Sequence, residues 1–169
     1  SRILCAILIY LILYLESNYT AALFLFFIAS FSDFLDGYLA RKTNSVSVLG
    51  EILDPIADKL LIVFVLIGLS INLNSFLIGF ISAVIISREI WVAALRDINS
   101  RNNQSEKTSV TFLAKTKTAI QMLSILIYLF GLTINNMMVL FFADIILIIA
   151  LLITIQTGLQ YTISTFRNE

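Results

Sequence analysis

Long apolar stretches, separated by short polar turns, make up most of this chain. A helix that crosses the hydrocarbon core of a bilayer needs about 20 mostly apolar residues. We therefore predict six membrane-spanning helices, over residues 3–15, 19–41, 46–70, 75–96, 112–134 and 137–164. The first is short for a full crossing, and since the chain starts at Ser1 rather than Met, we expect a lead-in segment to precede it. The prediction is a polytopic, all-α integral membrane protein with a single domain over residues 1–169.

The composition excludes several kinds of chemistry. Hydrophobic residues make up 59% of the 169 residues and charged residues 13%, about half of the ~25% that is usual in soluble domains. There is no histidine, so a Ser-His-Asp triad and an imidazole metal ligand are both excluded. A single cysteine excludes an internal disulfide and a cysteine-rich zinc site. Eleven basic and 11 acidic residues cancel, so we expect no nucleic-acid partner.

The basic residues are distributed unevenly between the two ends of the predicted helices. The turns at residues 16–20, 72–75 and 135–136 contain no Lys or Arg. All 11 basic residues lie at or near the opposite ends of the helices: Arg2, Arg41, Lys42, Lys59, Arg88, Arg96, Arg101, Lys107, Lys115, Lys117 and Arg167. Under the positive-inside rule, we therefore predict that both termini and the polar loop at residues 97–111 face the cytoplasm.

Two of the predicted helices carry carboxylates where a membrane-spanning helix normally carries apolar residues. Asp33 and Asp36 are spaced i, i+3 near the end of the second span, so one helix face holds both. Asp54 and Asp58 are spaced i, i+4 near the start of the third span, in line with Gly50 one turn earlier. Ionisable residues inside a membrane are costly and usually functional. A short turn joins these two helices, so we expect their acidic stripes to face each other at the cytoplasmic end.

Carboxylates that converge in a medium of low dielectric repel one another, and divalent cations would relieve that repulsion. Carboxylate oxygens suit hard ions such as Mg²⁺ or Mn²⁺. Two such ions can clamp the attacking and leaving oxygens of an in-line displacement at phosphorus. Gly37, Ala40 and Gly50 remove bulk beside the acidic stripes, and Arg41 offers a bidentate partner for a phosphate. The pattern therefore predicts a two-metal site for chemistry at a phosphate.

These residues form one motif, D-x-x-D-G-x-x-A-R, eight further residues and G-x-x-x-D-x-x-x-D. The positions that match it are Asp33, Asp36, Gly37, Ala40, Arg41, Gly50, Asp54 and Asp58. The motif is the signature of the CDP-alcohol phosphatidyltransferase family, which the chain resembles over nearly its whole length. The resemblance implies transfer of a phosphatidyl group from a CDP-linked lipid, CDP-diacylglycerol, to an alcohol, with release of CMP. It also implies a homodimer in the bacterial inner membrane, with the active site facing the cytoplasm.

The resemblance further implies a role for each motif residue. The implied metal ligands are Asp33, Asp36, Asp54 and Asp58. The residues implied to line the site for the cytidine and the diphosphate are Gly37, Ala40, Arg41 and Gly50. Asp58 is also implied to accept the proton of the acceptor hydroxyl. The composition supports this last role, because in a chain without histidine a carboxylate is the available general base.

Basic residues at the cytoplasmic ends of two other spans predict what the acceptor is. Arg88 and Arg96 share one arc of the fourth span, and Lys115 and Lys117 open the fifth. A cationic pocket formed by these four residues beside the metal site suits an acceptor that carries phosphate. Lys115 and Lys117 lie about 200° apart on a helix. We therefore expect one of them to face the pocket and the other to reach lipid phosphates.

Three segments favour one branch of the family. The run Asp54-Pro-Ile-Ala-Asp58-Lys59, the Arg-Glu pair at 88–89 and the Lys-Thr-Lys-Thr run at 115–118 resemble the bacterial branch that joins CDP-diacylglycerol to sn-glycerol 3-phosphate. The cardiolipin synthase and phosphatidylinositol-phosphate synthase branches are the alternatives. From a different class, a divalent-cation transporter could use the acidic cluster as an ion site. The nearly apolar outer halves of the second and third spans disfavour such a conduction path.

The other charged residues have simpler interpretations. Snorkelling to the membrane interface is the alternative role for Arg88 and Arg96. Asp144 lies inside the sixth span, far in sequence from the motif. We expect Asp144 either to pair with a polar side chain of another helix or to lie at a subunit contact. Plain surface charge is expected of Arg2, Lys42, Arg101, Lys107 and Arg167.

Overall fold

The computed structural model describes the backbone of residues 2–15, 18–43, 48–102 and 112–167, and the side chains of residues 2–15, 18–32, 56–102 and 116–167. Within these ranges the chain folds into six helices and no strands, as the apolar pattern predicts. The helices are α1 (Arg2–Leu15), α2 (Tyr19–Thr43), α3 (Val48–Asn72), α4 (Phe76–Arg101), α5 (Phe112–Thr133) and α6 (Met137–Phe166). The prediction of an all-α protein is therefore confirmed.

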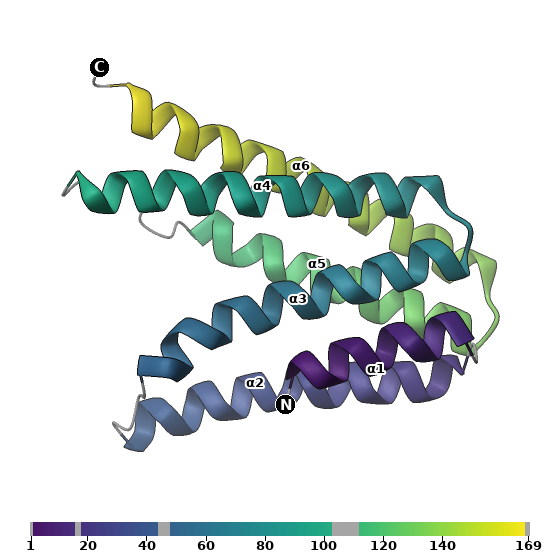
Figure 1. Cartoon of the computed structure of the whole chain (residues 1–169). Helices are drawn as coiled ribbons and strands as arrows, with labels where there is room; N and C mark the ends of the chain where they lie inside the picture. Colours follow the sequence, from purple (N-terminus) through teal and green to yellow (C-terminus); the bar gives the residue numbers. More distant parts are fainter. Residues whose placement is uncertain (1, 16–17, 44–47, 103–111, 168–169) are drawn as a thin grey trace.

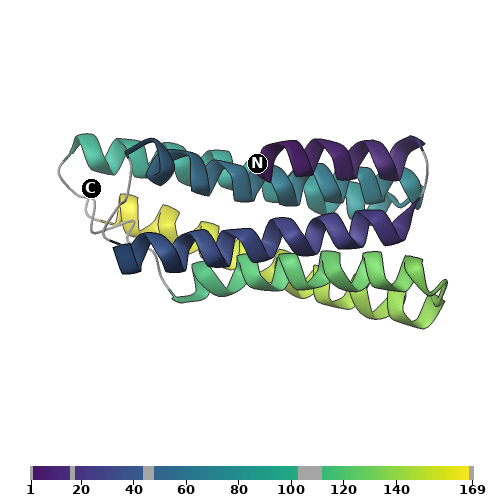
Figure 2. The ribbon, with the colours of Figure 1, turned by 90° about the horizontal axis from the view of Figure 1, so that it is seen from below.

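The long helices run along a common direction, and consecutive helices are antiparallel (Figure 1). The α1–α2, α3–α4 and α5–α6 connections gather at one end of the bundle, which we call the asparagine end after Asn72, Asn74, Asn135 and Asn136 in its turns. The other end holds the last turns of α4 and α6, and we call it the arginine end after Arg96 and Arg101 in the last part of α4. Helix α1 packs against α2 and α3, while α6 packs against α4 and α5. Figure 2 shows that α1 covers only part of the length of the bundle.

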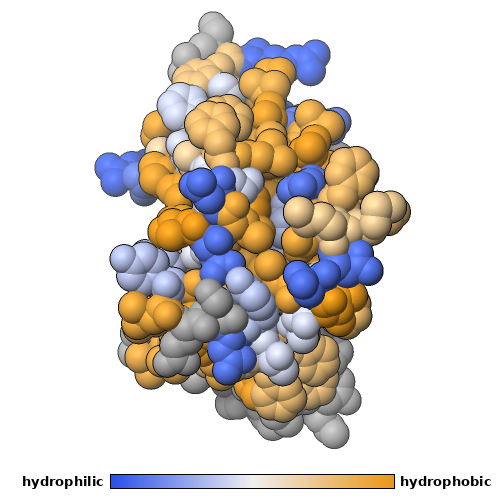
Figure 3. Space-filling view, turned by 90° about the vertical axis from the view of Figure 1, so that its right-hand side faces the viewer, coloured by the Kyte–Doolittle hydropathy of each residue, from blue (hydrophilic) through white to orange (hydrophobic). Residues whose placement is uncertain are grey.

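The asparagine end is built by residues that tolerate tight turns. Asn74 and Asn135 have positive φ values of 48° and 50°, in the left-handed region that asparagine adopts more readily than most residues. The residue that follows each turn caps the next helix: the side chain of Ser75 accepts from the Ile78 N–H at 3.4 Å, and that of Asn136 from the Met138 N–H at 3.0 Å. Viewed face-on in Figure 3, this end shows hydrophilic side chains among apolar ones.

The half of the bundle next to the asparagine end is filled by apolar side chains. Its largest fully buried members include Ile9, Leu13, Phe26, Leu61, Leu66, Leu69, Ile78, Ile81, Ile125 and Leu129. Small residues at contacts between helices allow the backbones to approach, as is common where helices pack within a membrane. Those in this core are Ala6, Ala22, Ala29 and Ala143. Close packing of apolar side chains therefore holds this half together.

A partly buried polar pair interrupts this apolar half. Asp144 on α6 accepts a hydrogen bond from the hydroxyl of Tyr128 on α5, whose side chain is buried. Nearby, the hydroxyl of Ser124 donates to the carbonyl of Ala143 at 3.1 Å. Of the two alternatives predicted for Asp144, the structure shows the pairing with a polar side chain of another helix.

The outer surface of the bundle is strongly apolar. Phe24, Phe76 and Met137 are 67%, 86% and 80% exposed. On α6 the buried residues follow a helical period and include Ala143, Leu147, Ala150 and Thr154, whereas Leu152 on the opposite face is exposed. Among the described residues, α4, α6 and residues 116–133 of α5 are long and apolar enough to cross a membrane. Exposed apolar side chains over such helices are expected where the surroundings are lipid rather than water.

The predicted polar loop at residues 97–111 begins later than expected, because α4 continues to Arg101. The reason is tertiary as well as local. Asn99 is buried, and its amide donates to the hydroxyl of Thr165 on α6 at 2.9 Å. Asp97 and Arg101 form an i, i+4 ion pair at 2.8 Å on the exposed face. Polar residues that looked like a loop therefore form an additional helical turn against α6.

Candidate active site

The motif carboxylates lie on two of these helices. The backbone is helical through Asp33 and Asp36 on α2 and through Asp54 and Asp58 on α3. The i, i+3 and i, i+4 spacings therefore place each pair on one helix face, as predicted. The predicted site residues whose side chains lie outside the described residues are Asp33, Asp36, Gly37, Ala40, Arg41, Gly50, Asp54 and Lys115. The meeting of the two acidic stripes, and with it the metal site, stays a prediction.

Asp58 is the motif carboxylate whose side chain the structure describes. It lies on α3 with 26% of its side chain exposed, and its Oδ1 is 2.6 Å from Nη1 of Arg2 on α1. The side chain of Arg2 is 6% exposed, so the prediction that Arg2 is a surface charge is wrong. The physical reason is that α1 packs against α3, which brings its first turn beside Asp58.

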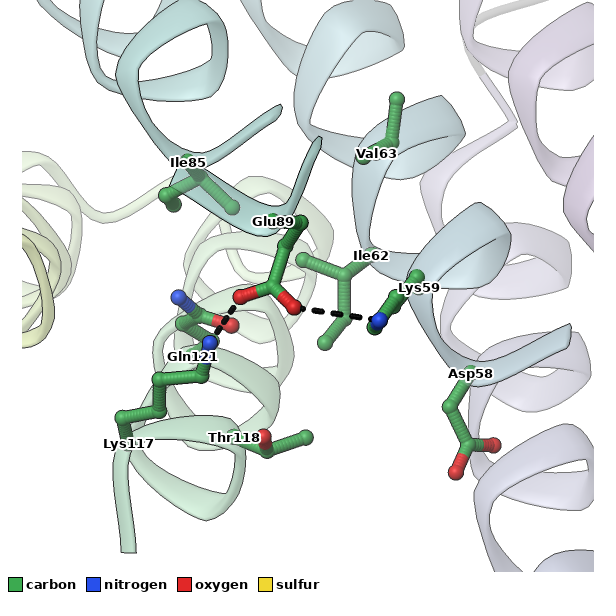
Figure 4. A pocket seen from close by; sticks show the side chains of 9 residues that line it. All are labelled: Asp58, Lys59, Ile62, Val63, Ile85, Glu89, Lys117, Thr118 and Gln121. Atoms are coloured by element: carbon green, nitrogen blue, oxygen red, sulfur yellow. Dashed lines mark hydrogen bonds and ion pairs between the residues drawn. The ribbon is translucent and has the colours of Figure 1, made fainter. Parts of the chain in front are cut away.

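A cavity of about 160 Å³ lies beside Asp58. Its walls come from α3, α4 and α5, and the lining residues are Asp58, Lys59, Ile62, Val63, Ile85, Glu89, Lys117, Thr118 and Gln121. Figure 4 shows Lys59, Glu89 and Lys117 converging on its interior from these three helices. The hydrocarbon side chains form the wall toward the apolar half of the bundle, so the polar groups meet in surroundings of reduced dielectric.

The carboxylate of Glu89 is the centre of the charged groups in this cavity. Its Oε2 is 3.3 Å from Nζ of Lys59, and its Oε1 is 2.9 Å from Nη1 of Arg88. The same Oε1 also contacts Nζ of Lys117. One carboxylate thus faces three cations, and the local charge is positive.

Arg88 is held in place by several neighbours on α4 and α6. Its Nη2 donates to the hydroxyl of Thr157 at 2.8 Å, and its guanidinium carbon lies 5.7 Å from the centre of the Tyr161 ring. A Cβ atom at Gly158 would come within 3.1 Å of Cγ of Arg88. The glycine therefore gives the arginine side chain room to pass along α6.

Two buried donors beside the cavity have no partner among the described residues. They are Nε of Arg88 and Nε of Arg96. The guanidinium carbon of Arg96 lies 5.5 Å from the same Tyr161 ring, so both arginines meet at one aromatic side chain. Buried polar atoms without partners are rare in proteins and point to a missing ligand or water. Since both donors are cationic, the ligand that they favour is an anion such as a phosphate.

The structure also describes one of the two lysines predicted to face the pocket. Lys117 lines the cavity with 6% of its side chain exposed. One turn further along α5, the amide of Gln121 donates to the hydroxyl of Thr154 at 3.1 Å, which anchors this part of α5 to α6. Of the sequence-predicted acceptor residues, Arg88 and Lys117 therefore meet at Glu89, and Arg88 and Arg96 meet at Tyr161.

Of the four predicted metal ligands, Asp58 is the one whose side chain lies among the described residues. In the described side chains no group of three or more potential ligands gathers. Asp58, the described member of the predicted set, presents a partly exposed carboxylate at the cavity wall. The helical spacing of the four aspartates and their purely oxygen donors fit hard divalent ions.

Comparison with known proteins identifies the family. A family model described as CDP-alcohol phosphatidyltransferase matches residues 1–156. The chain belongs to the CDP-alcohol phosphatidyltransferase family. The resemblance inferred from the aspartate motif is therefore confirmed, and the chain is a membrane transferase of this enzyme family.

Several curated members of the CDP-alcohol phosphatidyltransferase family are similar over most of this chain, and the three compared below are named CDP-diacylglycerol--glycerol-3-phosphate 3-phosphatidyltransferase. The one from Haemophilus influenzae is 37% identical over 149 residues, which cover 87% of this chain and 78% of the relative. The one from Rickettsia bellii is 42% identical, covering 81% and 74%. The one from Rickettsia felis is 38% identical, covering 95% and 88%.

Several residues of this candidate site are not assigned to it by the sequence alone. They are Arg2, Lys59, Glu89, Thr157 and Tyr161. Glu89 could have been proposed from the sequence, because it directly follows Arg88 and both charged residues lie in a predicted span. Thr157 and Tyr161 are spaced i, i+4 on α6, but a hydroxyl and an aromatic ring in a membrane helix are too common to mark a site. Only the packing of α6 against α4 shows that both contact Arg88.

Proposed function

We propose that this chain transfers the phosphatidyl group of CDP-diacylglycerol to sn-glycerol 3-phosphate, forming phosphatidylglycerophosphate and CMP. The relatives that carry the name of this reaction support it. The observation that carries the choice of acceptor is the pair of buried, unpartnered Nε donors of Arg88 and Arg96 beside the cationic cavity. A phosphorylated alcohol supplies the anion that these donors lack, whereas a neutral alcohol does not.

In the proposed reaction the 1-hydroxyl oxygen of glycerol 3-phosphate attacks the phosphorus that carries the diacylglycerol. A new P–O bond forms, the bond between that phosphorus and the bridging oxygen breaks, and CMP leaves with the electron pair. Asp58 accepts the proton of the attacking hydroxyl. Its place at the cavity wall supports this role, because a general base must reach the hydroxyl directly or through one water.

The acceptor phosphate would be bound by Arg88, Arg96 and Lys117, with Lys115 as a further candidate. The cation–ring contacts of both arginines with Tyr161 support this assignment, since they bring the two guanidinium groups to one side chain while their Nε atoms have no protein partner among the described residues. If these residues hold the phosphate of glycerol 3-phosphate in place, the 1-hydroxyl at the other end of the acceptor is directed toward Asp58.

The remaining roles follow the aspartate motif. Asp33, Asp36, Asp54 and Asp58 would hold two Mg²⁺ or Mn²⁺ ions, which when bound would offset the charge of the diphosphate and of the departing CMP. The cytidine and diphosphate would lie against Gly37, Ala40, Arg41 and Gly50. The small side chains support this placement, because they allow a charged ligand to approach the helix backbone.

We further propose that all six helices span the bacterial inner membrane, with the active site and both termini on the cytoplasmic side. The uneven distribution of basic residues supports this orientation. The protein would act as a homodimer within this membrane. Chemical cross-linking in native membranes, followed by electrophoresis, tests the dimer, and a purely monomeric pattern would contradict it.

The experiment that tests the function measures CMP release by the purified full chain in lipid nanodiscs. CDP-diacylglycerol is supplied with Mg²⁺ or Mn²⁺, and the acceptors offered are sn-glycerol 3-phosphate, phosphatidylglycerol, inositol phosphate and glycerol. We expect release that requires both metal and glycerol 3-phosphate and that is lost in Asp58→Asn. Asp97→Asn makes the same chemical change on an exposed ion pair and should keep full activity.

Equal or faster release with phosphatidylglycerol or inositol phosphate would overturn the choice of acceptor and favour another branch of the family. Full activity of Asp58→Asn would overturn the role of this residue as the base. Metal uptake into sealed vesicles without any CMP release would instead support a transporter.

A further inference from the structure

The contacts of Glu89 are unusual for an acidic residue in a membrane protein. Its carboxylate meets Lys59 from α3, Arg88 from α4 and Lys117 from α5, so three helices converge on it. Figure 4 shows Glu89 between Lys59 and Lys117, at the centre of the cavity wall. The aspartate motif does not include this residue, and the proposed chemistry gives it no proton or ligand to handle.

The burial of these groups explains why such a carboxylate is needed. The side chains of Glu89, Arg88 and Lys117 are 17%, 8% and 6% exposed. Like charges repel more strongly in surroundings of low dielectric than in water. Lysine side chains are also flexible, with many rotamers to adopt. Without a counter-charge, the buried ammonium of Lys117 would turn away from the two other cations. Glu89 therefore determines where Lys117 lies.

Glu89 also determines the orientation of Arg88. The guanidinium donates through Nη1 to Glu89 and through Nη2 to Thr157, at 2.9 Å and 2.8 Å. These two bonds hold one edge of the planar group, and Nε is the donor that stays without a partner. The unpartnered Nε of Arg96 lies near the same Tyr161 ring. The free Nε donor of Arg88 thus depends on Glu89 for its orientation.

The geometry points to Glu89 as a positioning residue for the acceptor: its carboxylate holds Lys59, Arg88 and Lys117 in the arrangement that binds the phosphate of a phosphorylated alcohol. This inference rests on the proposed function. It assigns the selectivity for a phosphate-bearing acceptor to a negatively charged residue within a cationic pocket. Because Glu89 carries one negative charge against three positive charges, the group keeps a net positive charge that attracts a phosphate dianion. The same carboxylate keeps the three cations close together.

The test compares steady-state kinetics of the wild type with Glu89→Gln, Glu89→Asp and the matched control Asp97→Asn, all as full chains in nanodiscs. We expect Glu89→Gln to raise the KM for glycerol 3-phosphate tenfold or more. The kcat and the KM for CDP-diacylglycerol should change less than twofold. Glu89→Asp retains the charge and should recover most of the acceptor affinity, and Asp97→Asn should match the wild type.

A residue that merely ties α3, α4 and α5 together would give a different result. Glu89→Gln would then lower kcat, raise both KM values together and reduce the melting temperature, and Glu89→Asp would not restore the acceptor KM selectively. That outcome, or an unchanged or lowered acceptor KM in Glu89→Gln, would overturn the inference.

A double variant keeps the test informative if Glu89→Gln alone does not fold. Removing both members of a buried ion pair is better tolerated than removing one. We expect the acceptor KM of the double variant Glu89→Gln/Lys117→Gln to rise less than tenfold above that of Lys117→Gln, because Glu89 acts partly through Lys117 and partly through Arg88. A further tenfold rise in the double variant would overturn this coupling. A wild type without glycerol-3-phosphate-dependent activity would overturn both the proposed function and this inference, whereas an active wild type with an insensitive Glu89→Gln would overturn the inference alone.

Discussion

The two halves of this bundle are stabilised in different ways. Next to the asparagine end, large apolar side chains such as Phe26, Leu66 and Ile125 are completely buried. Toward the arginine end, the buried side chains include Arg2, Arg88, Asn99, Lys117 and Thr157. Among the described side chains, the bundle thus passes from a dry, close-packed region into one whose interior is charged and hydrogen-bonded.

This contrast shows where stability and function are separated within one small membrane protein. Tight apolar packing needs no particular chemistry at any one position, and substitutions there act mainly on stability. Buried charges contribute little net stability, because their mutual attraction offsets the cost of removing them from water. They are therefore expected to serve binding or catalysis, and substitutions at the arginine end should act mainly on kinetics.

The largest effect on stability is expected from Phe26→Ala in the apolar half. The side chain is completely buried, and a cavity of this size costs about 3–5 kcal/mol in proteins generally. We expect a loss at the lower end of this range. In lipid, the burial of an apolar side chain between helices contributes no free energy of transfer from water, so its removal costs less. Reversible unfolding in detergent measures the loss, and the kcat of the folded fraction should not change. A large loss of kcat at full stability would contradict the separation of the two halves.

The opposite result is expected from Arg88→Leu at the arginine end. Loss of this guanidinium removes one of the two free Nε donors and the cation beside Glu89. We expect kcat/KM for glycerol 3-phosphate to fall about 100-fold, or about 2.7 kcal/mol of transition-state stabilisation. The melting temperature should change little, because an apolar replacement of a buried charge is often neutral. A fall in stability without a kinetic effect would show that Arg88 is structural.

An intermediate effect is expected at the Tyr128–Asp144 pair in the apolar half. Asp144→Leu would leave the buried hydroxyl of Tyr128 without its acceptor, at a cost of about 1–3 kcal/mol. Asp144→Asn keeps an acceptor oxygen and should cost less than half as much. Both variants should retain wild-type kcat and KM, measured as CMP release. A selective kinetic defect in Asp144→Asn would instead connect this pair to the reaction.

The smallest effect is expected from Gly158→Ala, at the contact between α6 and Arg88. An added Cβ would lie 3.1 Å from Cγ of Arg88, so the arginine must shift by a few tenths of an ångström. We expect a KM for glycerol 3-phosphate raised about two- to fivefold, which is below 1 kcal/mol, with unchanged kcat. Gly79→Ala, near Ser70 in the apolar half, is the matched control and should leave KM unaltered.

Much of the fold could be predicted because each helix is determined by its own residues. Long apolar stretches give the helices, and Asn74 and Asn135 supply positive φ values in two of the turns between them. The prediction was poorest where a polar segment borders a helix. Residues Asp97–Arg101 resemble a loop in composition, but the buried bond from Asn99 to Thr165 makes them the last turn of α4.

The candidate site could be predicted where its residues follow a fixed spacing and not where they come from different helices. The aspartate motif identifies the family, because neighbouring positions on one helix share a face whatever the rest of the fold does. Arg88, Arg96 and Lys117 could be proposed from charge alone. The partners that orient them, Glu89 and Tyr161, could not be assigned.

The sequence by itself thus determined the helices, the uneven distribution of basic residues and the family, since all three depend on spacing along the chain. Only the tertiary structure decided that Arg2 pairs with Asp58, that Tyr128 pairs with Asp144 and that three cations share the carboxylate of Glu89. The physical reason is that a charge buried in a membrane takes whichever partner helix packing brings within reach, and that partner can lie anywhere in the sequence.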